Sequence, residues 1–280
     1  MARRFINFNG EFYAEEEPVI GISNRGFRYG DGLFESMRWA KGELKFVDLH
    51  AKRIRRGMDL LRLGKHLDID HHFLCNKVEE LVRKNRTGLY ARARLTVFRH
   101  AGGLYSPTSN EVGYALDVIK SEELIHASNA PGLIVDVFDE IPKPINMLSN
   151  VKTCNALLFV LAGIFKNKFS LDEVLIVNQN GFLCEAMSSN LFVVYKKKIY
   201  TPALSEGCVE GVMRSVVMRL AAENGLEVIE AQINPEILHE ADELFLTNVN
   251  KGIRWVMGFN NKRYFNEVSR FLATRLNEYQ

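Results

Sequence analysis

A lysine and a glutamate in apolar surroundings are the first residues of this sequence that point to chemistry. Lys152 lies directly before an apolar segment, within residues 150–155. A lysine removed from water has a lowered pKa and can form an imine, although a lysine at a helix start is more often solvated. Glu185 lies in the otherwise apolar residues 181–185. It is either exposed or paired, and a buried carboxylate there could hold a proton on the nitrogen of a bound ring.

Two further segments have features of an anion site. Residues 207–214, GCVEGVMR, place two glycines at the start of a predicted helix, and backbone N–H groups at a helix N-terminus bind phosphate. Arg53 lies on a basic predicted helix with Arg55 and Arg56. Such a run of charges is usually a solvated face, but one inward guanidinium could fork onto a phosphate.

Arginines in a predicted strand are candidates for binding a carboxylate. Tyr90 to Phe98 alternates between apolar and polar residues, so Arg92 and Arg94 share one face of that strand, and Arg99 follows it. An outward-facing pair is the simpler interpretation, whereas an arginine that faces a cleft could clamp a substrate carboxylate. Gly30 and Gly32 on either side of Asp31 indicate a turn, which is either strained or part of a ligand-lining loop.

The elements that must position these residues alternate irregularly between strand and helix. Asp48 is a predicted N-cap for a helix through about Leu63, residues 133–137 form a predicted strand, and residues 155–166 form a helix. This order indicates an α+β fold rather than a doubly wound βαβ series. The sequence has no GxGxxG after a strand and no Walker-type loop. Polar residues 122–132 form a predicted linker between domains at 1–121 and 133–280.

Composition narrows the class of protein. The 280 residues have a formal net charge of +2, with both signs interleaved, so nothing calls for a nucleic acid or an anionic membrane as partner. The four cysteines lack metal-ligand spacing and are expected to be reduced thiols. No apolar stretch has the length of a membrane span or the form of a secretory signal. We expect a cytoplasmic protein without a metal.

In this order, the segments resemble the class IV aminotransferases, the fold-type IV enzymes that use pyridoxal 5'-phosphate (PLP). The resemblance runs from about Arg25 to Val256. It rests on segments that are individually unspecific but have the family's order and spacing: residues 29–35, 50–53, Lys152 with Asn155, Glu185 with 189–192, 201–202, 211–214 and 246–248. It implies a small N-terminal α+β domain, a larger C-terminal α/β barrel-like domain and a homodimer.

The resemblance also implies roles for individual residues. Lys152 would carry PLP and move protons, Glu185 would pair with the ring nitrogen, and Arg53 would help to hold the phosphate. The residues implied in cofactor binding are Arg53, Lys152, Glu185, Ser189, Asn190, Val212, Met213, Val249 and Asn250. Those implied on the substrate side are Tyr29, Arg92, Arg94 and Arg99.

Three functions are compatible with these residues. The first, which we favour, is an aminotransferase that moves an amino group between an amino acid and a 2-oxo acid. The second is an aminodeoxychorismate lyase, which releases pyruvate and 4-aminobenzoate, because residues 99–107 resemble the lyase glycine loop. The third is a non-catalytic binding protein on the same scaffold. Substrate chirality and the choice of carboxylate-binding residue among Arg28, Arg92, Arg94 and Arg99 stay open.

Overall fold

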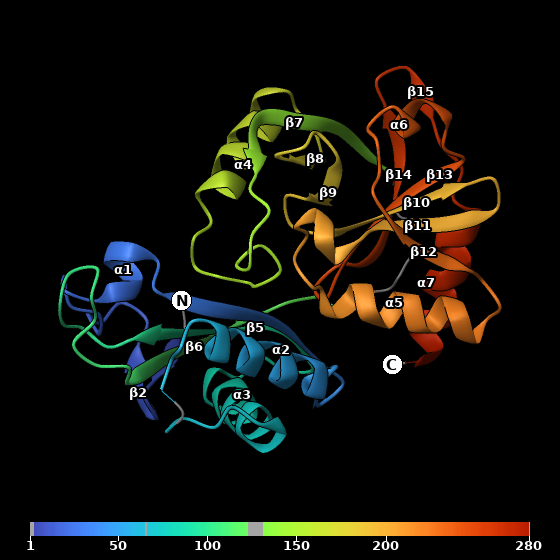
Figure 1. The fold of residues 1–280 in the computed structure, drawn as a ribbon. Coiled ribbons are helices and arrows are strands. Elements are labelled where there is room, and N and C mark those ends of the chain that lie inside the picture. Colours follow the sequence, from blue (N-terminus) through green and yellow to red (C-terminus); the bar gives the residue numbers. More distant parts are fainter. Residues whose placement is uncertain (1–2, 65, 123–130, 280) are drawn as a thin grey trace. The chain divides into compact units, whose positions relative to one another are not determined.

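The chain divides into two compact units in a computed structural model that describes residues 3–64, 66–122 and 131–279 (Figure 1). The first unit comprises Met1–Glu123 with Val151–Asn155, and the second comprises Leu124–Asn150 with Ala156–Gln280. Residues 123–130 of the predicted linker lie outside the described residues. Each unit is considered by itself.

The N-terminal unit contains one six-stranded antiparallel sheet and three helices. The strand order is β2-β1-β6-β5-β3-β4. The strands are β1 (Phe5–Phe8), β2 (Glu11–Ala14), β3 (Gly32–Ala40), β4 (Glu43–Leu44), β5 (Tyr90–Arg99) and β6 (Val112–Lys120). The helices are α1 (Arg25–Tyr29), α2 (Val47–Leu60) and α3 (His71–Asn85).

Helices α2 and α3 cover one face of this sheet (Figure 1). Leu33 and Met37 of β3 pack in a continuous core with Ile54 and Met58 of α2 and Leu81 of α3. Because strand side chains alternate between faces, the residues between these core positions in β3 point to the other side of the sheet. That other face carries several of the candidate site residues.

The C-terminal unit is built on a nine-stranded mixed sheet. The order is β12-β11-β10-β13-β14-β7-β8-β9, with β15 paired to β14. Its strands are β7 (Leu133–Lys143), β8 (Glu173–Asn178), β9 (Leu183–Ala186), β10 (Asn190–Tyr195), β11 (Lys198–Pro202), β12 (Val228–Ala231), β13 (Glu243–Asn248), β14 (Gly252–Phe259) and β15 (Lys262–Arg263). Its helices are α4 (Leu157–Lys168), the 3-10 turn η1 (Leu204–Glu206), α5 (Val212–Glu223), α6 (Ile237–Glu240) and α7 (Glu267–Tyr279).

The predicted α+β class is confirmed, and several local predictions need correction. Asp48 is the second residue of α2, because Phe46 takes the N-cap position with a φ of 56°. Strand β7 continues through Pro142 to Lys143, with a register irregularity after Phe138 that accommodates the missing proline N–H. Residues 151–155 group with the N-terminal unit by their contacts, and the predicted domain boundaries themselves stay a prediction.

A buried ionic cluster fastens α2 to β3. Glu35 of β3 is 1% exposed. Its carboxylate is 2.7 Å from His50 Nδ1 and accepts hydrogen bonds from Arg53 Nε, at 2.7 Å, and Arg53 Nη2. Burial raises the pKa of Glu35, but the charge and hydrogen bonds of Arg53, helped by His50, outweigh burial and lower it to about 2. Burial lowers the pKa of His50, so the ring is neutral and donates from Nδ1.

This cluster makes the stability of the protein depend on acid pH. Since the pKa of Glu35 falls from 4.5 to about 2 on folding, its stabilising contribution is present above pH 4.5 and declines as the pH falls toward 2. The shift corresponds to roughly 3 kcal/mol. We expect the difference in free energy of unfolding between the wild type and Glu35→Gln, measured in urea, to shrink markedly from pH 6 to pH 3. The exposed Glu11→Gln is the control, and an equal difference at both pH values would contradict the assignment.

Candidate functional site

The candidate site residues fall into two groups, one in each unit. Lys152, Arg53, Tyr29 and the strand arginines belong to the N-terminal unit, and Glu185 belongs to the C-terminal unit. The remaining cofactor candidates of the C-terminal unit are Ser189, Asn190, Val212, Met213, Val249 and Asn250. Each group has its own geometry.

Lys152 is held at the edge of β3 by backbone pairing. Phe34 N–H donates to Lys152 O at 3.0 Å, and Cys154 N–H donates to Gly32 O at 2.9 Å. Lys152 Nζ lies 4.2 Å from the centre of the Phe34 ring. The lysine is therefore half-buried on the sheet face that α2 and α3 leave uncovered.

A close packing contact fixes the chain just after Lys152. The side chain of Asn155 donates to Gly30 O at 3.1 Å. A Cβ atom on Gly30 would lie 2.8 Å from Asn155 Oδ1, and Gly30 has a φ of +64°. Both the space and the left-handed backbone require glycine at this position, so the turn and the lysine segment are held together.

Arg94 shares the Phe34 ring with Lys152. Its guanidinium carbon lies 3.8 Å from the ring centre, a cation–π contact. Burial lowers the pKa of Arg94 from its ordinary value, and the nearby Cys154 and Asp117 oppose that shift. Among the described residues, the Arg94 guanidinium has no hydrogen-bond or ion-pair partner. Arg94 is thus a half-buried cation with donors available beside Lys152.

Arg99 has a structural role instead. It is 6% exposed and donates to Asp31 Oδ2 at 3.0 Å, to Leu61 O at 2.7 Å, to Arg62 O at 3.2 Å and to Asn110. Because these acceptors engage all of its nitrogens, Arg99 is not available to a substrate carboxylate, and its predicted substrate role is not supported.

The other substrate-side candidates are more exposed to solvent than Arg99. Arg92 is exposed on the same strand as Arg94. Tyr29 ends α1, with its ring centre 5.5 Å from that of Tyr105 and 5.0 Å from the guanidinium carbon of Arg25. Arg28 donates to Ile22 O at 2.9 Å on an exposed part of the chain.

Glu185 is the buried carboxylate of the C-terminal group. It is 4% exposed in β9. One carboxylate oxygen accepts a hydrogen bond from Lys143 Nζ, and the other accepts from Val209 N–H at 3.1 Å. The sequence left open whether Glu185 is exposed or paired. In the structure it is buried and paired.

The N-terminus of α5 provides buried donors without protein acceptors. Val212 and Met213 are 4% and 1% exposed, and Gly211 at the N-cap supplies no side-chain cap. Within the described part of the chain, neither N–H group donates to a protein acceptor. Buried N–H groups at a helix N-terminus form a ready site for a phosphate.

Two polar side chains lie near the start of α5: Asn190 of β10 and Thr247 of β13. A Cβ atom on Gly211 would lie 2.1 Å from Asn190 Oδ1, so a larger residue there would displace the Asn190 side chain. Asn190 pairs across β10 and β13 with Thr247. The Thr247 hydroxyl is buried and has no hydrogen-bond partner among the described residues. These unused polar groups fit the phosphate of PLP, which the resemblance implies.

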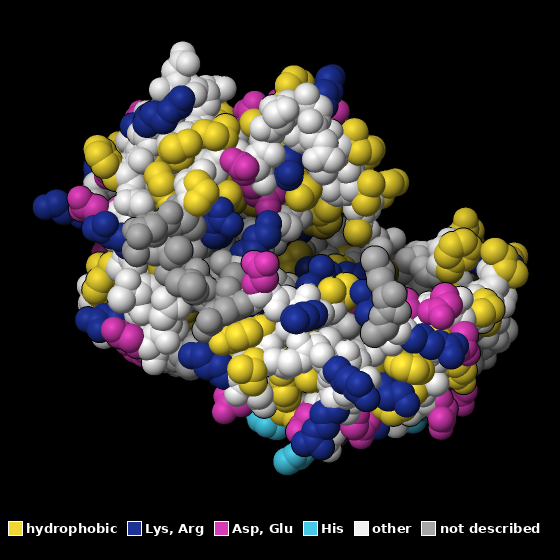
Figure 2. Space-filling model, turned by 180° about the vertical axis from the view of Figure 1, so that it is seen from behind, with side chains coloured by type: hydrophobic (Ala, Val, Ile, Leu, Met, Phe, Trp, Pro, Cys, Tyr) yellow, Lys and Arg dark blue, Asp and Glu magenta, His cyan; other side chains and the backbone are white. Residues whose placement is uncertain are grey.

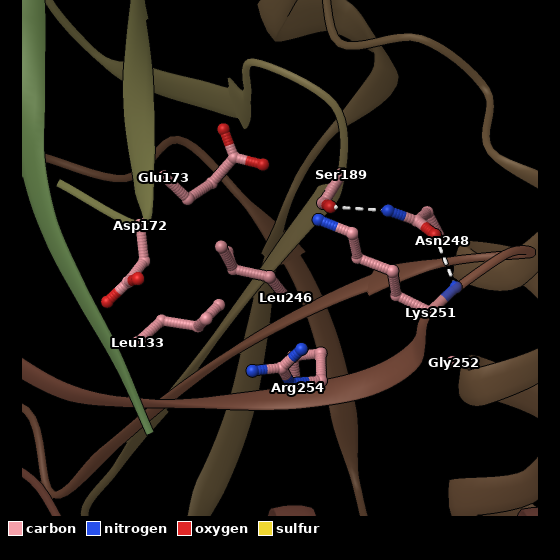
Figure 3. A pocket seen from close by; sticks show the side chains of 9 residues that line it. All are labelled: Leu133, Asp172, Glu173, Ser189, Leu246, Asn248, Lys251, Gly252 and Arg254. Atoms are coloured by element: carbon pink, nitrogen blue, oxygen red, sulfur yellow. Dashed lines mark hydrogen bonds between the residues drawn. The ribbon is translucent and has the colours of Figure 1, made fainter. Parts of the chain in front are cut away.

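A loop after β13 is organised by Asn248. Its side chain donates to Ser189 Oγ at 2.9 Å and accepts from the Lys251 N–H at 2.8 Å (Figure 3). It also accepts from the Asn250 N–H at 3.1 Å. A pocket lies beside this loop, with Glu173 and Arg254 also lining it. The turn that contains Val249 and Asn250 is thus tied to Ser189 through the side chain of Asn248.

Two of these residues were not predicted from the sequence. Lys143 and the Thr247 hydroxyl were not predicted as site residues. The segment from Ile141 to Ile145, in which two prolines and two isoleucines flank Lys143, was a signal for a buried lysine. For Thr247 no local pattern distinguishes a buried, unpaired hydroxyl from an ordinary strand threonine.

Other kinds of site find no support in the described ranges. They contain no group of three or more His, Cys, Asp or Glu side chains that could hold a metal, and no helix there is long and apolar enough to cross a membrane. All four cysteines are free thiols. Figure 2 shows positive and negative side chains interspersed over one face.

Comparison with known proteins finds relatives and solved structures that resemble this chain over most of its length. A protein of Methanocaldococcus jannaschii assigned as a branched-chain-amino-acid aminotransferase is 29% identical over 251 residues, 86% of this chain and 83% of the relative. The PLP form of a branched-chain amino acid aminotransferase from Thermobaculum terrenum superposes with a TM-score of 0.87 at 20% identity, over 99% of this chain and 94% of that one.

A structure of the lyase type has the same fold. A Legionella pneumophila protein assigned as a 4-amino-4-deoxychorismate lyase superposes with a TM-score of 0.85 at 19% identity, over 95% of this chain and 97% of that one. The family model for amino-transferase class IV matches residues 32–257. The predicted family and its fold are confirmed, and the chain belongs to the class IV aminotransferases.

Proposed function

We propose that this protein is a PLP-dependent aminotransferase that moves an amino group between an amino acid and a 2-oxo acid. The observation that carries the proposal is the set of unused buried donors at the start of α5 and at Thr247, in the same unit as the buried carboxylate of Glu185. A phosphorylated pyridine needs an anion site for its phosphate and an acid partner for its ring nitrogen.

In this proposal each residue has one task. The N–H groups of Val212 and Met213 bind the phosphate, supported by Arg53 and by the turn that contains Val249 and Asn250. Ser189 and Asn190 help to shape the same region. Glu185 would hold the proton on the ring nitrogen, and Lys152 would hold the cofactor and move a proton at the substrate Cα. PLP, when bound, supplies the electron sink.

We assign the substrate carboxylate to Arg94. Its guanidinium shares the Phe34 ring with Lys152 Nζ, at 3.8 and 4.2 Å from the ring centre, whereas the donors of Arg99 are engaged. A half-buried guanidinium with available donors is suited to a bidentate bond with a carboxylate. Tyr29 and Arg92 are then secondary contributors on the substrate side.

A lyase acting on aminodeoxychorismate is the second candidate. Its support is the glycine loop after β5, where Gly102 and Gly103 have φ values of +133° and +71°. The buried Arg25 donates to the carbonyls of Gly102, at 3.0 Å, and Leu104. The hydrogen bonds from Arg25 therefore fix the conformation of this loop.

The proposal includes a homodimer in the cytoplasm. Helix α4 exposes Leu157, Val160 and Ile164, which are 71%, 54% and 59% accessible. Their spacing of three and four residues places them on one side of the helix. An exposed apolar stripe of this kind is typical of an interface between subunits.

Replacement of the lysine tests the proposed chemistry. Purified wild type should show the yellow absorbance of lysine-bound PLP, and a single L- or D-amino acid should bleach it without any acceptor. Lys152→Ala should lose that band and lower the rate at least about 100-fold, whereas Lys168→Ala, an exposed lysine of α4, should behave as wild type. Borohydride reduction and peptide mapping locate the modified lysine. A band retained in Lys152→Ala would contradict the assignment.

The same spectrum separates the two candidate reactions. If the band is present but no amino acid bleaches it, pyruvate release from aminodeoxychorismate is the deciding assay. A protein that binds PLP but performs neither reaction would instead support the non-catalytic alternative.

Arg94→Gln should weaken binding of both the amino acid and the 2-oxo acid. Loss of a hydrogen bond to a charged group costs about 1.5–3 kcal/mol, so we expect KM to rise roughly 10- to 100-fold while the affinity for PLP stays unchanged. Arg92→Gln on the same strand is the matched control. A larger effect of Arg92→Gln would transfer the carboxylate role to Arg92.

Sedimentation velocity tests the proposed dimer. We expect wild type at micromolar concentration to sediment with twice the mass of one chain. A charge on the apolar stripe, Val160→Glu, should shift it toward the monomer, whereas Asn180→Glu, in the exposed turn between β8 and β9, should not. A monomeric wild type would contradict the proposed assembly, and a dimeric Val160→Glu would exclude α4 as its interface.

A further inference from the structure

Lys143 is a buried lysine that the proposed reaction does not yet use. It ends β7 and is 7% exposed. Its Nζ donates to the Glu185 carboxylate and, at 3.1 Å, to Ser149 O. The Phe159 ring centre lies 5.6 Å from the same nitrogen. A lysine is seldom buried without a specific partner, and here the partner is the carboxylate assigned to the cofactor ring.

The turn after Lys143 is built to hold this arrangement. Ser149 Oγ donates to Pro144 O at 2.7 Å and accepts from Asn146 N–H at 2.9 Å. The side chain of Asn150 donates to Leu204 O at 2.8 Å and to Cys208 O at 2.7 Å. The carbonyl of Ser149 is therefore fixed, and with it the position of the Lys143 ammonium group.

The Glu185 carboxylate keeps room for one more donor. Lys143 occupies one oxygen, and Val209 N–H occupies the other at 3.1 Å. An ionised carboxylate has about four lone-pair positions, so these two bonds orient the group without saturating it. A pyridinium N–H is a donor of the kind that such a carboxylate accepts.

We propose that Lys143 is a positioning residue for Glu185: it compensates the charge of the buried carboxylate and orients it before the cofactor arrives, ready to accept the N–H of a phosphorylated pyridine ring. This inference rests on the proposed function, because it gives Glu185 the ring nitrogen as its ligand. Lys143 acts through Glu185 and does not touch the substrate.

The neighbouring titratable groups leave this task to Lys143. Burial, followed by the nearby Glu185 charge, raises the pKa of the Cys184 and Cys208 thiols, that of Cys208 to about 11. Both thiols are therefore neutral at ordinary pH. Arg214 is paired with Glu230 at 2.6 Å, and the cross-strand neighbour of Glu185 in β8 is the apolar Ile176.

Removal of the lysine charge should make cofactor affinity depend on pH. A buried carboxylate without a counter-charge takes up a proton, and it must release that proton before it can accept the ring N–H. In Lys143→Met the dissociation constant for PLP, divided by that of wild type at the same pH, should rise as the pH falls from 9 to 6. The slope should approach about tenfold per pH unit, the limit for one proton. The ratio cancels the ionisation of PLP itself.

The experiment titrates PLP into cofactor-free, full-length protein and follows absorbance at pH 6, 7, 8 and 9. Lys143→Arg, which retains the charge, should follow wild type. Glu243→Gln removes another buried carboxylate of the same unit, one that accepts from Val268 N–H at 2.8 Å. It should lower stability without changing the pH profile of the affinity. A ratio for Lys143→Met that does not change with pH overturns the proposal.

If Lys143→Met does not fold, Lys143→Gln carries the same test, because its amide can still donate a hydrogen bond to Glu185 but supplies no positive charge. Its affinity ratio should also rise as the pH falls; a ratio for Lys143→Gln that does not change with pH, or a slope in Lys143→Arg, overturns the proposal. A wild type that binds no PLP contradicts the proposed function itself. If wild type binds PLP but the pH dependence of PLP affinity is the same in the Lys143 variants, only the role of Lys143 is contradicted.

Discussion

Compensation of buried carboxylate charge is the constraint on which the candidate site depends. Glu35 and Glu185 are 1% and 4% exposed, and removing one partner of such a buried pair costs several kcal/mol. Each carboxylate therefore holds a basic group from a different element close to it: Arg53 of α2 for Glu35, and Lys143 of β7 for Glu185. The two ion pairs set the position of a helix on one sheet and of a strand end on the other.

The opposite situation holds at the start of α5. There the donors are buried and their acceptors are missing from the described protein, although buried backbone N–H groups are nearly always paired. An anionic ligand would relieve that cost, and the N-terminal end of a helix favours negative charge. Thus the C-terminal unit has one carboxylate with its charge compensated and a neighbouring set of donors that lack an acceptor.

The arginines of β5 have different roles because they lie on opposite faces of the strand, a difference that amino-acid composition does not show. Arg92 and Arg94 differ by two positions and share a face, whereas Arg99 has the opposite parity. Arg99 consequently points to the helix-covered side, where the carbonyls at the end of α2 accept its hydrogen bonds. Asp31 accepts from both Arg99 and Arg25, so this aspartate of the glycine turn supports the fold rather than lining a ligand.

Local pattern in the sequence was sufficient for the α+β class and most strands, because alternation and helical spacing depend on neighbouring residues. The family came from the resemblance of several segments, in their order and spacing, to class IV aminotransferases. The sequence also identified Lys152, Glu185 and the start of α5 as candidates, since their types and surroundings are local features; their roles and the predicted domain boundary stay predictions. Only the tertiary structure decided that Glu185 pairs with Lys143, which is 42 residues away in the chain, and that Lys152 and Arg94 share one ring. The reason is physical: such partnerships arise from packing between distant segments, and no local periodicity records them.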